Sequence, residues 1–280
     1  MPSRPMRKIV MSAWATLLCL TTGPVACAHD ILLAVDFDGH PVGPYTADAF
    51  RADWHVEPGE SAGIADDRLA IVPDPLGPSR HVLRVTYRAG RVGGRSAMTF
   101  NAPLGAGLSD VWLEYRVMFP SEFTWVRGGK LPGLGAGDTP TGCIANGRFH
   151  GVTTRLMWRE GGQAFNYFYF PGKTSRCGDY ASLQVRFQKG RWYTLTQHLR
   201  LNDPQQANGA FEQFIDGAKV LDLTGKVWRQ RDGVLVDAIK MDTFYGGATL
   251  DWSPKTDQFV YFDAFRVWSG PAHQESGSVR

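Results

Sequence analysis

Short runs of alternating polar and apolar residues recur along the chain, and glycine- and proline-rich segments separate them. Every second side chain of a strand points to the same side of its sheet, so such runs are typical of strands with one buried face. In residues 110–118, for example, Leu113, Tyr115 and Val117 share one face, and residues 192–200 alternate in the same way. Many short strands with few helical patterns favour two packed sheets, so the sequence predicts an all-β sandwich or jelly roll.

Residues 1–28 have the pattern of a secretory signal peptide. A positively charged start precedes an apolar run that ends near Leu20 and is too short to span a bilayer comfortably. Ala26 and Ala28 then form the small-x-small pattern of a cleavage site, which predicts a mature chain that begins at His29.

This signal predicts a secreted or periplasmic protein. An uncleaved anchor and attachment of a lipid at Cys27 are less favoured alternatives. No later segment is apolar enough to predict a membrane span. We therefore expect one β-jelly-roll domain over residues 29–270, followed by a polar C-terminal tail over residues 271–280.

Two cysteines, Cys143 and Cys177, remain once the predicted signal is removed. A metal site is not expected from two cysteines with no paired histidine nearby, whereas a disulfide is common in an oxidising compartment. If residues 160–163 form the turn of a hairpin, both cysteines are equally far from it and reach the same end of the paired strands. The sequence therefore predicts a Cys143–Cys177 disulfide.

Charge excludes one class of partner. The formal net charge is +3, and the acidic and basic residues are interspersed without a polybasic run. Nucleic acid is therefore not an expected partner.

The stretch from residue 155 to residue 170, RLMWREGGQAFNYFYF, consists of two alternating runs around a turn-like EGGQ. The alternation predicts one apolar face and one face that carries cations and phenols, formed by Arg155, Arg159, Tyr167 and Tyr169. Packing alone does not explain such a face, although a second layer of core is an alternative. We interpret it as the lining of a groove for a carbohydrate, because sugar rings stack on aromatic rings.

Thr153 shares the face of Arg155, and Lys130 could reach it from residues 124–151, which read as a long functional loop. The pair of carboxylates that glycoside hydrolysis usually needs is not found nearby. Cations and phenols suit β-elimination at a uronic acid instead. A Lys or Arg neutralises the carboxylate beside C5, and Tyr serves as base or acid if nearby cations lower its pKa.

The segments GGKLPGL, TTRLMWR and YFYF, in this order, with FYGGATLDWSP and YFDAFRVW near the end, resemble polysaccharide lyase family 14, whose members act on alginate and related polyuronates. The resemblance runs from about residue 110 to residue 270. It implies a concanavalin-like β-jelly roll with a substrate cleft across one sheet. The catalytic lysine of the family falls on Lys130, its S-x-R pair on Thr153 and Arg155, and its Y-x-Y pair on Tyr167 and Tyr169. Thr153 departs from the usual serine, and the added methyl group could reshape that subsite.

Further substrate contacts are predicted at Arg95, Arg159, His198 and Arg200. Plainer alternatives exist for several of the candidate residues. Lys130 could be a solvated lysine, Arg155 could form an ion pair with Glu160 or Glu114, and His198 could be a structural sheet histidine. Asp242 and Asp263 are interpreted as turn or structural residues.

We therefore predict an exported polysaccharide lyase that acts on a uronic-acid polymer, without a cofactor and as a monomer. The alternative is a carbohydrate-binding, lectin-like jelly roll without catalytic activity. Lys130 together with two ordered tyrosines favours the lyase, because sugar binding alone does not need that set.

Overall fold

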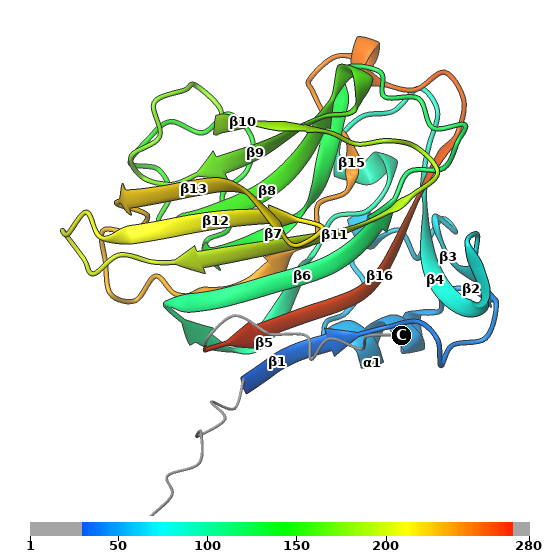
Figure 1. The fold of residues 1–280 in the computed structure, drawn as a ribbon, viewed down its shortest axis with the longest axis horizontal. Helices are drawn as coiled ribbons and strands as arrows, with labels where there is room; N and C mark the ends of the chain where they lie inside the picture. Colours follow the sequence, from blue (N-terminus) through cyan, green and yellow to red (C-terminus); the bar gives the residue numbers. More distant parts are fainter. Residues whose placement is uncertain (1–29, 271–280) are drawn as a thin grey trace, which may run out of the picture.

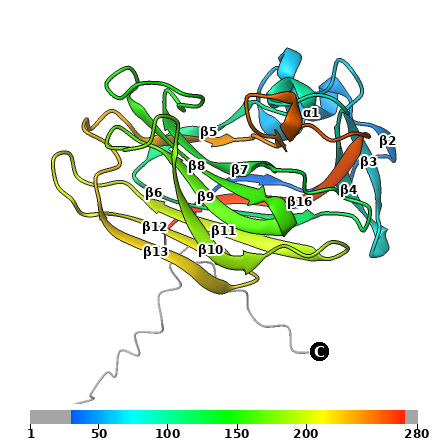
Figure 2. The same cartoon turned by 90° about the horizontal axis from the view of Figure 1, so that it is seen from above.

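Two antiparallel β-sheets packed face to face form most of residues 30–270, the part of the chain that the computed structural model describes (Figure 1, Figure 2). The predicted signal peptide and the predicted C-terminal tail lie outside the described residues. The two layers confirm the predicted all-β sandwich.

The larger sheet has nine strands, and many neighbours within it are far apart in the sequence. Its order is β13 (Ala218–Lys226), β12 (Gly209–Ile215), β11 (Trp192–Arg200), β6 (Asp110–Met118), β16 (Gln258–Ser269), β4 (Gly77–Tyr87), β3 (Leu69–Asp74) and β2 (Gly43–Pro44), with β1 (Asp30–Val35) beside β16.

The smaller sheet has seven strands and carries the candidate site. Its order is β10 (Asp179–Arg186), β9 (Gln163–Tyr169), β8 (Gly151–Arg159), β7 (Gly128–Gly137), β14 (Val236–Lys240) and β5 (Asn101–Leu108), with β15 (Phe244–Tyr245) beside β7.

The core lies between the two sheets, where the apolar face of each strand is buried. Leu156 and Trp158 of β8 and Leu195 and Leu199 of β11 are fully buried there, as the period-two pattern predicts. The opposite faces of both sheets are therefore the outer surfaces of the sandwich.

Two polar contacts also cross the core. Asn166 of β9 donates to Gln213 of β12 at 3.0 Å, and Thr154 of β8 donates to Gln197 of β11 at 3.0 Å. A buried polar group without a partner is costly, so these contacts favour one position of the sheets relative to each other.

Strand β7 corrects the prediction of a long loop over residues 124–151. Its glycines conceal the strand pattern, but close approach of neighbours requires them. A Cβ on Gly129 would overlap the ring of Trp158, and a Cβ on Gly133 would overlap the backbone of Thr154. Lys130 therefore lies in an inner strand of the sheet, and only residues 124–127 and the segment between β7 and β8 are loops.

Two further segments differ from the sequence patterns. Helix α1 (Ala47–Trp54) was not predicted; the Thr46 side chain caps its first turn, and Phe50 and Trp54 bury its apolar side. Residues 96–100 also alternate, but apart from the isolated bridge between Met98 and Thr243 they lie outside the named strands.

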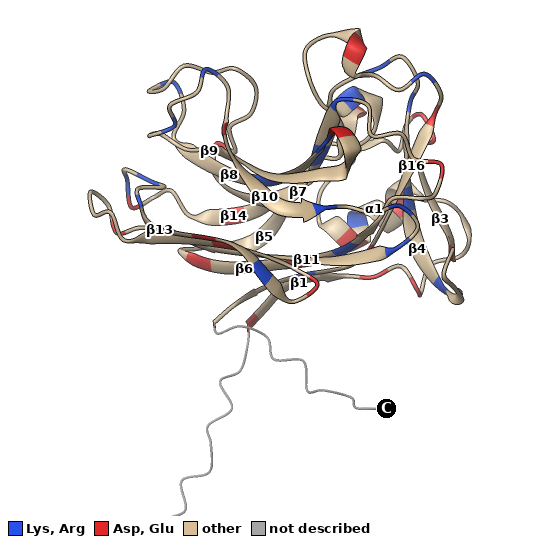
Figure 3. Cartoon of the chain, turned by 45° about the horizontal axis from the view of Figure 1, so that its top comes forward, with Lys and Arg blue, Asp and Glu red and all other residues tan. Residues whose placement is uncertain are grey.

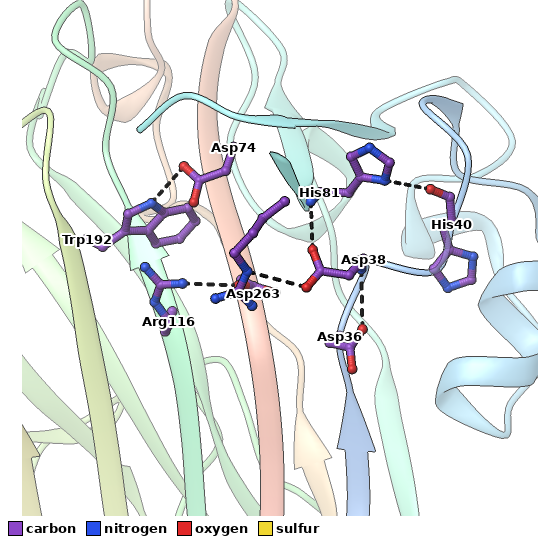
Figure 4. A network of polar contacts seen from close by, with 9 residues as sticks. Asp36, Asp38, His40, Asp74, His81, Arg116, Trp192 and Asp263 are labelled. Carbon is purple, nitrogen blue, oxygen red and sulfur yellow. Dashed lines mark hydrogen bonds and ion pairs between the residues drawn. The ribbon is translucent and has the colours of Figure 1, made fainter. Parts of the chain in front are cut away.

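Asp263, interpreted above as a turn or structural residue, lies in the middle of strand β16 (Figure 4). Its Oδ2 atom accepts from Arg80 and Arg116, both at 3.2 Å, and Asp38 binds Arg80 and the His81 backbone nearby. The buried carboxylate thus has cationic partners. In residues 30–270, no group of three or more His, Cys, Asp or Glu residues is arranged to hold a metal ion.

Acidic and basic residues are interspersed along the ribbon (Figure 3). Within residues 30–270 no helix has the length and apolar character that crossing a membrane requires.

Candidate active site

The hairpin formed by β8 and β9 places cations and phenols on one surface. Arg155 pairs with Tyr167 across the two strands, and Thr153 pairs with Tyr169. Gly161 and Gly162 make the turn with φ angles of 65° and 78°, which glycine adopts without strain. The hairpin and its polar face are as predicted, and this face points away from the larger sheet.

A pocket of about 860 Å³ lies on this outer face. Five basic residues contribute to its lining, namely Lys130, Arg155, Arg159, Arg176 and Lys240. Asp242 is the single carboxylate among the described lining residues. Aromatic rings complete the walls: Phe165, Tyr167, Tyr169, Tyr180, Phe244 and Trp252. A cavity with this charge balance suits an anionic ligand with flat, partly apolar rings.

Lys130 projects from β7 into the centre of the pocket. Its Nζ atom donates to the Met157 sulfur at 3.0 Å and lies 4.2 Å from the centroid of the Tyr167 ring. Burial lowers the pKa of Lys130 well below its usual range, and the positive charges of Arg155 and Arg159 lower it further, against an opposing effect of Asp242. A lysine of this kind can be neutral and act as a base.

Arg155 is 2% exposed and forms an ion pair with Asp242 through Nη1. Asp242 also accepts from the Thr99 hydroxyl and lies 3.6 Å from Lys240 Nζ. Burial by itself raises the pKa of Asp242, but Arg155 and Lys240 outweigh it, so the pKa is lowered and the carboxylate stays charged. The other guanidinium donors, Nε and Nη2, are buried without a partner.

The two phenols contact each other. Tyr169 donates to the Tyr167 hydroxyl at 3.3 Å, and the backbone N–H of Gly178 donates to the same oxygen at 2.9 Å. Burial and the bond to Tyr167 raise the pKa of Tyr169, although Arg155 acts in the opposite direction. At Tyr169, therefore, burial outweighs the effect of the nearby arginine.

A disulfide joins Cys143 to Cys177, whose Cα atoms are 4.0 Å apart, as predicted. It links the loop between β7 and β8 to the loop between β9 and β10, and both cysteines line the pocket. Lys130 itself lies in strand β7, so the disulfide restrains the wall of the pocket rather than the segment that carries the lysine.

Comparisons with known proteins agree with this geometry. The model of the polysaccharide lyase 14 family matches residues 77–265, well over half of the chain. The chain belongs to the polysaccharide lyase 14 family. It is therefore an enzyme, a polysaccharide lyase.

Solved structures resemble this lyase over most of their length. Alginate lyase Aly36B is 25% identical with a TM-score of 0.74, and the match covers 84% of this chain and 95% of that one. An alginate lyase from Aplysia kurodai is 19% identical with a TM-score of 0.71, covering 86% and 99%. A glucuronan lyase from the fungus Trichoderma reesei is 12% identical with a TM-score of 0.50, covering 72% and 87%. The last two support the fold alone. A search of curated proteins found no significant match.

Two predicted contacts of this lyase lie just outside the pocket. Thr153 is fully buried, and its hydroxyl donates to the Pro140 carbonyl at 2.9 Å. The loop after β7 thus accepts a hydrogen bond from Thr153, which is not among the residues that line the pocket. Arg95 is exposed and pairs with Glu60 at 3.1 Å, although its neighbour Gly94 does line the pocket.

His198 and Arg200 lie on the other side of the molecule, which corrects their expected role as substrate contacts. They alternate with the core residues of β11 and so point outward from the larger sheet. His198 is held between Asp110 at 2.7 Å and Glu212 at 2.8 Å and stacks on Trp112. His198 is therefore the structural sheet histidine that the sequence analysis gave as the alternative. Arg159, in contrast, does line the pocket, 5.2 Å from the Trp252 ring.

Several lining residues were missed by sequence reasoning. Asp242 was interpreted as structural, because nothing in the sequence links it to Arg155, 87 positions away. Met157 lies on the predicted polar face but is apolar, so it carried no chemical signal. Arg176, Lys240 and Trp252 come from three other segments that only the fold brings together.

Proposed function

We propose that this lyase cleaves alginate or a closely related uronic-acid polymer by β-elimination. The observation that carries the proposal is the Arg155 guanidinium, which has two buried donors without partners in a pocket with five basic residues and a single carboxylate. A substrate carboxylate would supply the missing acceptors. The similar structures support this proposal, since they include alginate lyases, one of them in complex with an alginate tetrasaccharide.

The roles of the residues follow from their charge states. Arg155, held by Asp242, neutralises the carboxylate and makes the C5 proton more acidic. Lys130, whose pKa is lowered, removes that proton as the base. A tyrosine then protonates O4 as the C4–O4 bond breaks. This narrows the expectation from the sequence, in which a Lys or Arg neutralised the carboxylate and a tyrosine served as base or acid.

Substrate class is tested with the purified protein and three separate polymers, polymannuronate, polyguluronate and polyglucuronate. The expected result is ultraviolet absorbance of a 4,5-unsaturated uronate with at least one of them. A neutral glucan serves as the matched control, because it has no carboxylate for Arg155. Absence of unsaturated product with every uronate would contradict the proposal.

We also propose that the mature protein is exported. The Cys143–Cys177 disulfide supports this, because disulfides persist in oxidising compartments. Mass spectrometry of the protein from its native cell should find a chain that begins at His29. A chain that keeps its first residues would contradict cleavage, and a lipid mass on Cys27 would favour the lipoprotein alternative.

A further inference from the structure

We infer that Arg159 is a second carboxylate receptor of the pocket, which binds a uronate other than the one that loses its C5 proton. The inference rests on the proposed β-elimination and deepens it, because it predicts a preference for polymers in which uronates follow one another without neutral sugars between them. It is carried by a contact of arginine with aromatic rings that occurs twice on the β8–β9 hairpin.

Two rings hold the guanidinium of Arg159. Its Cζ atom lies 5.9 Å from the centroid of the Phe165 ring and 5.2 Å from the Trp252 ring. Two tyrosine rings of β9 contact Arg155 in the same way, at 5.7 Å and 5.1 Å. A guanidinium on aromatic faces keeps its N–H donors, which lie in its own plane, for a carboxylate. The hairpin therefore presents two arginines in similar surroundings.

The two arginines differ in their polar partners. Arg155 is paired with Asp242, whereas the guanidinium of Arg159 has neither a hydrogen bond nor an ion pair within residues 30–270. The Arg159 side chain is exposed and lines the pocket. Its charge is therefore available to an anionic ligand, and a planar carboxylate fits its paired donors.

Trp252, the ring that comes from outside the hairpin, is itself fixed. A Cβ on Gly247 would lie 2.3 Å from it, so the indole packs directly against the backbone there. The Arg127 guanidinium also contacts this ring, at 5.5 Å, and forms an ion pair with Asp251. A donor that is already held in place loses less conformational freedom when its ligand binds. Arg159 is thus prepared for a carboxylate, although it is exposed.

Lys130 lies between the two receptors. Met157 separates Arg155 from Arg159 on the outer face of β8, pairs with Lys130 in register and accepts from its Nζ atom at 3.0 Å. Both arginines lower the pKa of the lysine, so both charges act on its amine. A uronate has a single carboxylate, and Arg155 binds it when C5 faces Lys130. The carboxylate that reaches Arg159 therefore belongs to another sugar of the same chain.

The test changes the charge pattern of the substrate and leaves its linkage and stereochemistry unchanged. The polyuronate that the unmodified lyase cleaves fastest is prepared as a series in which a rising share of carboxylates is reduced at random to primary alcohols. Each sugar that must carry a carboxylate multiplies the rate at low substrate concentration by the remaining carboxylate fraction. The slope of the logarithm of this rate against the logarithm of the fraction therefore counts the carboxylates that the site requires.

Arg159→Gln should lower this slope by one, because one required carboxylate is lost. On the unreduced polymer the variant should raise KM by about 10-fold with little change in kcat, as expected when one charge-assisted contact that is equally strong in the bound substrate and the transition state is removed. Trp252→Leu should raise KM by about 2- to 5-fold, because Arg159 remains but loses one ring, and Trp252→Phe should restore most of this loss.

Arg84→Gln is the matched control. Arg84 also contacts an aromatic ring, that of Phe259 at 4.9 Å, but it lies on β4 of the larger sheet and outside the pocket lining. The variant removes the same charge from the protein, so its KM and its slope should equal those of the unmodified lyase. Equal changes in Arg84→Gln and Arg159→Gln would assign the effect to net charge and overturn the inference.

The remaining outcomes separate the inference from the proposed function. An Arg159→Gln variant with the slope and KM of the unmodified lyase would overturn the inference alone, because cleavage of the polyuronate would continue without a second receptor. An unmodified protein that forms no unsaturated uronate from any of the polymers would overturn the proposed function and the inference with it.

Discussion

Burial lowers the pKa of Lys130 well below its usual range, and its Nζ atom lies 4.2 Å from the centroid of the Tyr167 ring. We predict that Lys130→Ala lowers kcat by about 100- to 10,000-fold, the usual contribution of a general base, while the thermal unfolding midpoint hardly changes. In the unmodified lyase, activity should rise with pH through the lowered lysine pKa, because only the neutral amine accepts a proton. Lys255→Ala, an exposed loop lysine, is the control. Near-normal turnover of Lys130→Ala would exclude it as the base.

Asp242 influences Lys130 through its charge. The carboxylate raises the lysine pKa, against burial and the arginines. We predict that Asp242→Asn moves the acid limb of kcat/KM to lower pH and raises KM, because Arg155 loses the partner that orients it. Thr99→Val removes only a hydrogen bond to Asp242 and keeps the charge, so its acid limb should stay in place. An unmoved limb in Asp242→Asn would contradict this coupling.

At the scale of the elements, strand β7 depends on the absence of side chains. We predict that Gly133→Ala destabilises the fold by about 1–3 kcal/mol, because its Cβ would overlap the Thr154 backbone rather than a movable side chain. Gly39→Ala is the control, since a Cβ there meets nothing within 4 Å. Denaturant unfolding measures both. Equal stability of the two variants would show that β7 can move away from β8.

The disulfide connects two loops rather than two strands, so its effects on folding and on activity should separate. Replacing both Cys143 and Cys177 with Ser should lower the free energy of unfolding by about 3–4 kcal/mol in the chain-entropy model, given a sequence separation of 34. Activity should fall at temperatures where the sandwich is still folded, because the loop that presents Gly178 loses its anchor. If activity and the near-ultraviolet circular dichroism signal of this variant are lost at the same temperature, the two effects are not separate.

Period-two alternation predicted the β8–β9 hairpin, because each of its residues has a defined face whatever the partner strands are. The same pattern did not reveal β7, where glycine replaces the side chains that make alternation visible. It could not give the order of strands either. The pairing of β14 with β7 joins segments about 100 residues apart, its pairing with β5 joins segments about 130 apart, and packing of the whole molecule determines both.

The site was predictable to the extent that it lies on that hairpin. Arg155, Tyr167 and Tyr169 follow from one short stretch of sequence and the resemblance to the lyase family. Asp242 and Gly178 act through a carboxylate and a backbone N–H from other segments, and neither residue type is unusual in a loop or at a strand end. His198 was misplaced because alternation alone does not say which sheet a strand joins.

For the whole molecule, His198 links stability to pH. Burial by itself lowers its pKa, but the hydrogen bonds to Asp110 and Glu212 outweigh it and raise the pKa above the usual value of a histidine, about 6.5. The stabilisation is therefore fully present below pH 6.5 and is lost as the pH rises through the raised pKa. We predict that the free energy of unfolding decreases over that interval and that His198→Gln removes this part of the decrease. Urea titrations at several pH values measure the free energy of unfolding. If it depends on pH in His198→Gln just as it does in the unmodified lyase, the assignment to His198 is contradicted.

The hydrogen bonds from Asn166 to Gln213 and from Thr154 to Gln197 lie directly behind the catalytic strands. Apolar layers tolerate small sliding motions, but a directional bond between side chains is satisfied over a narrow range of positions. Shear of one sheet over the other would break both contacts in a buried environment. The floor of the pocket is therefore rigid before any polymer arrives, and adjustment to different uronates falls to the loops around it.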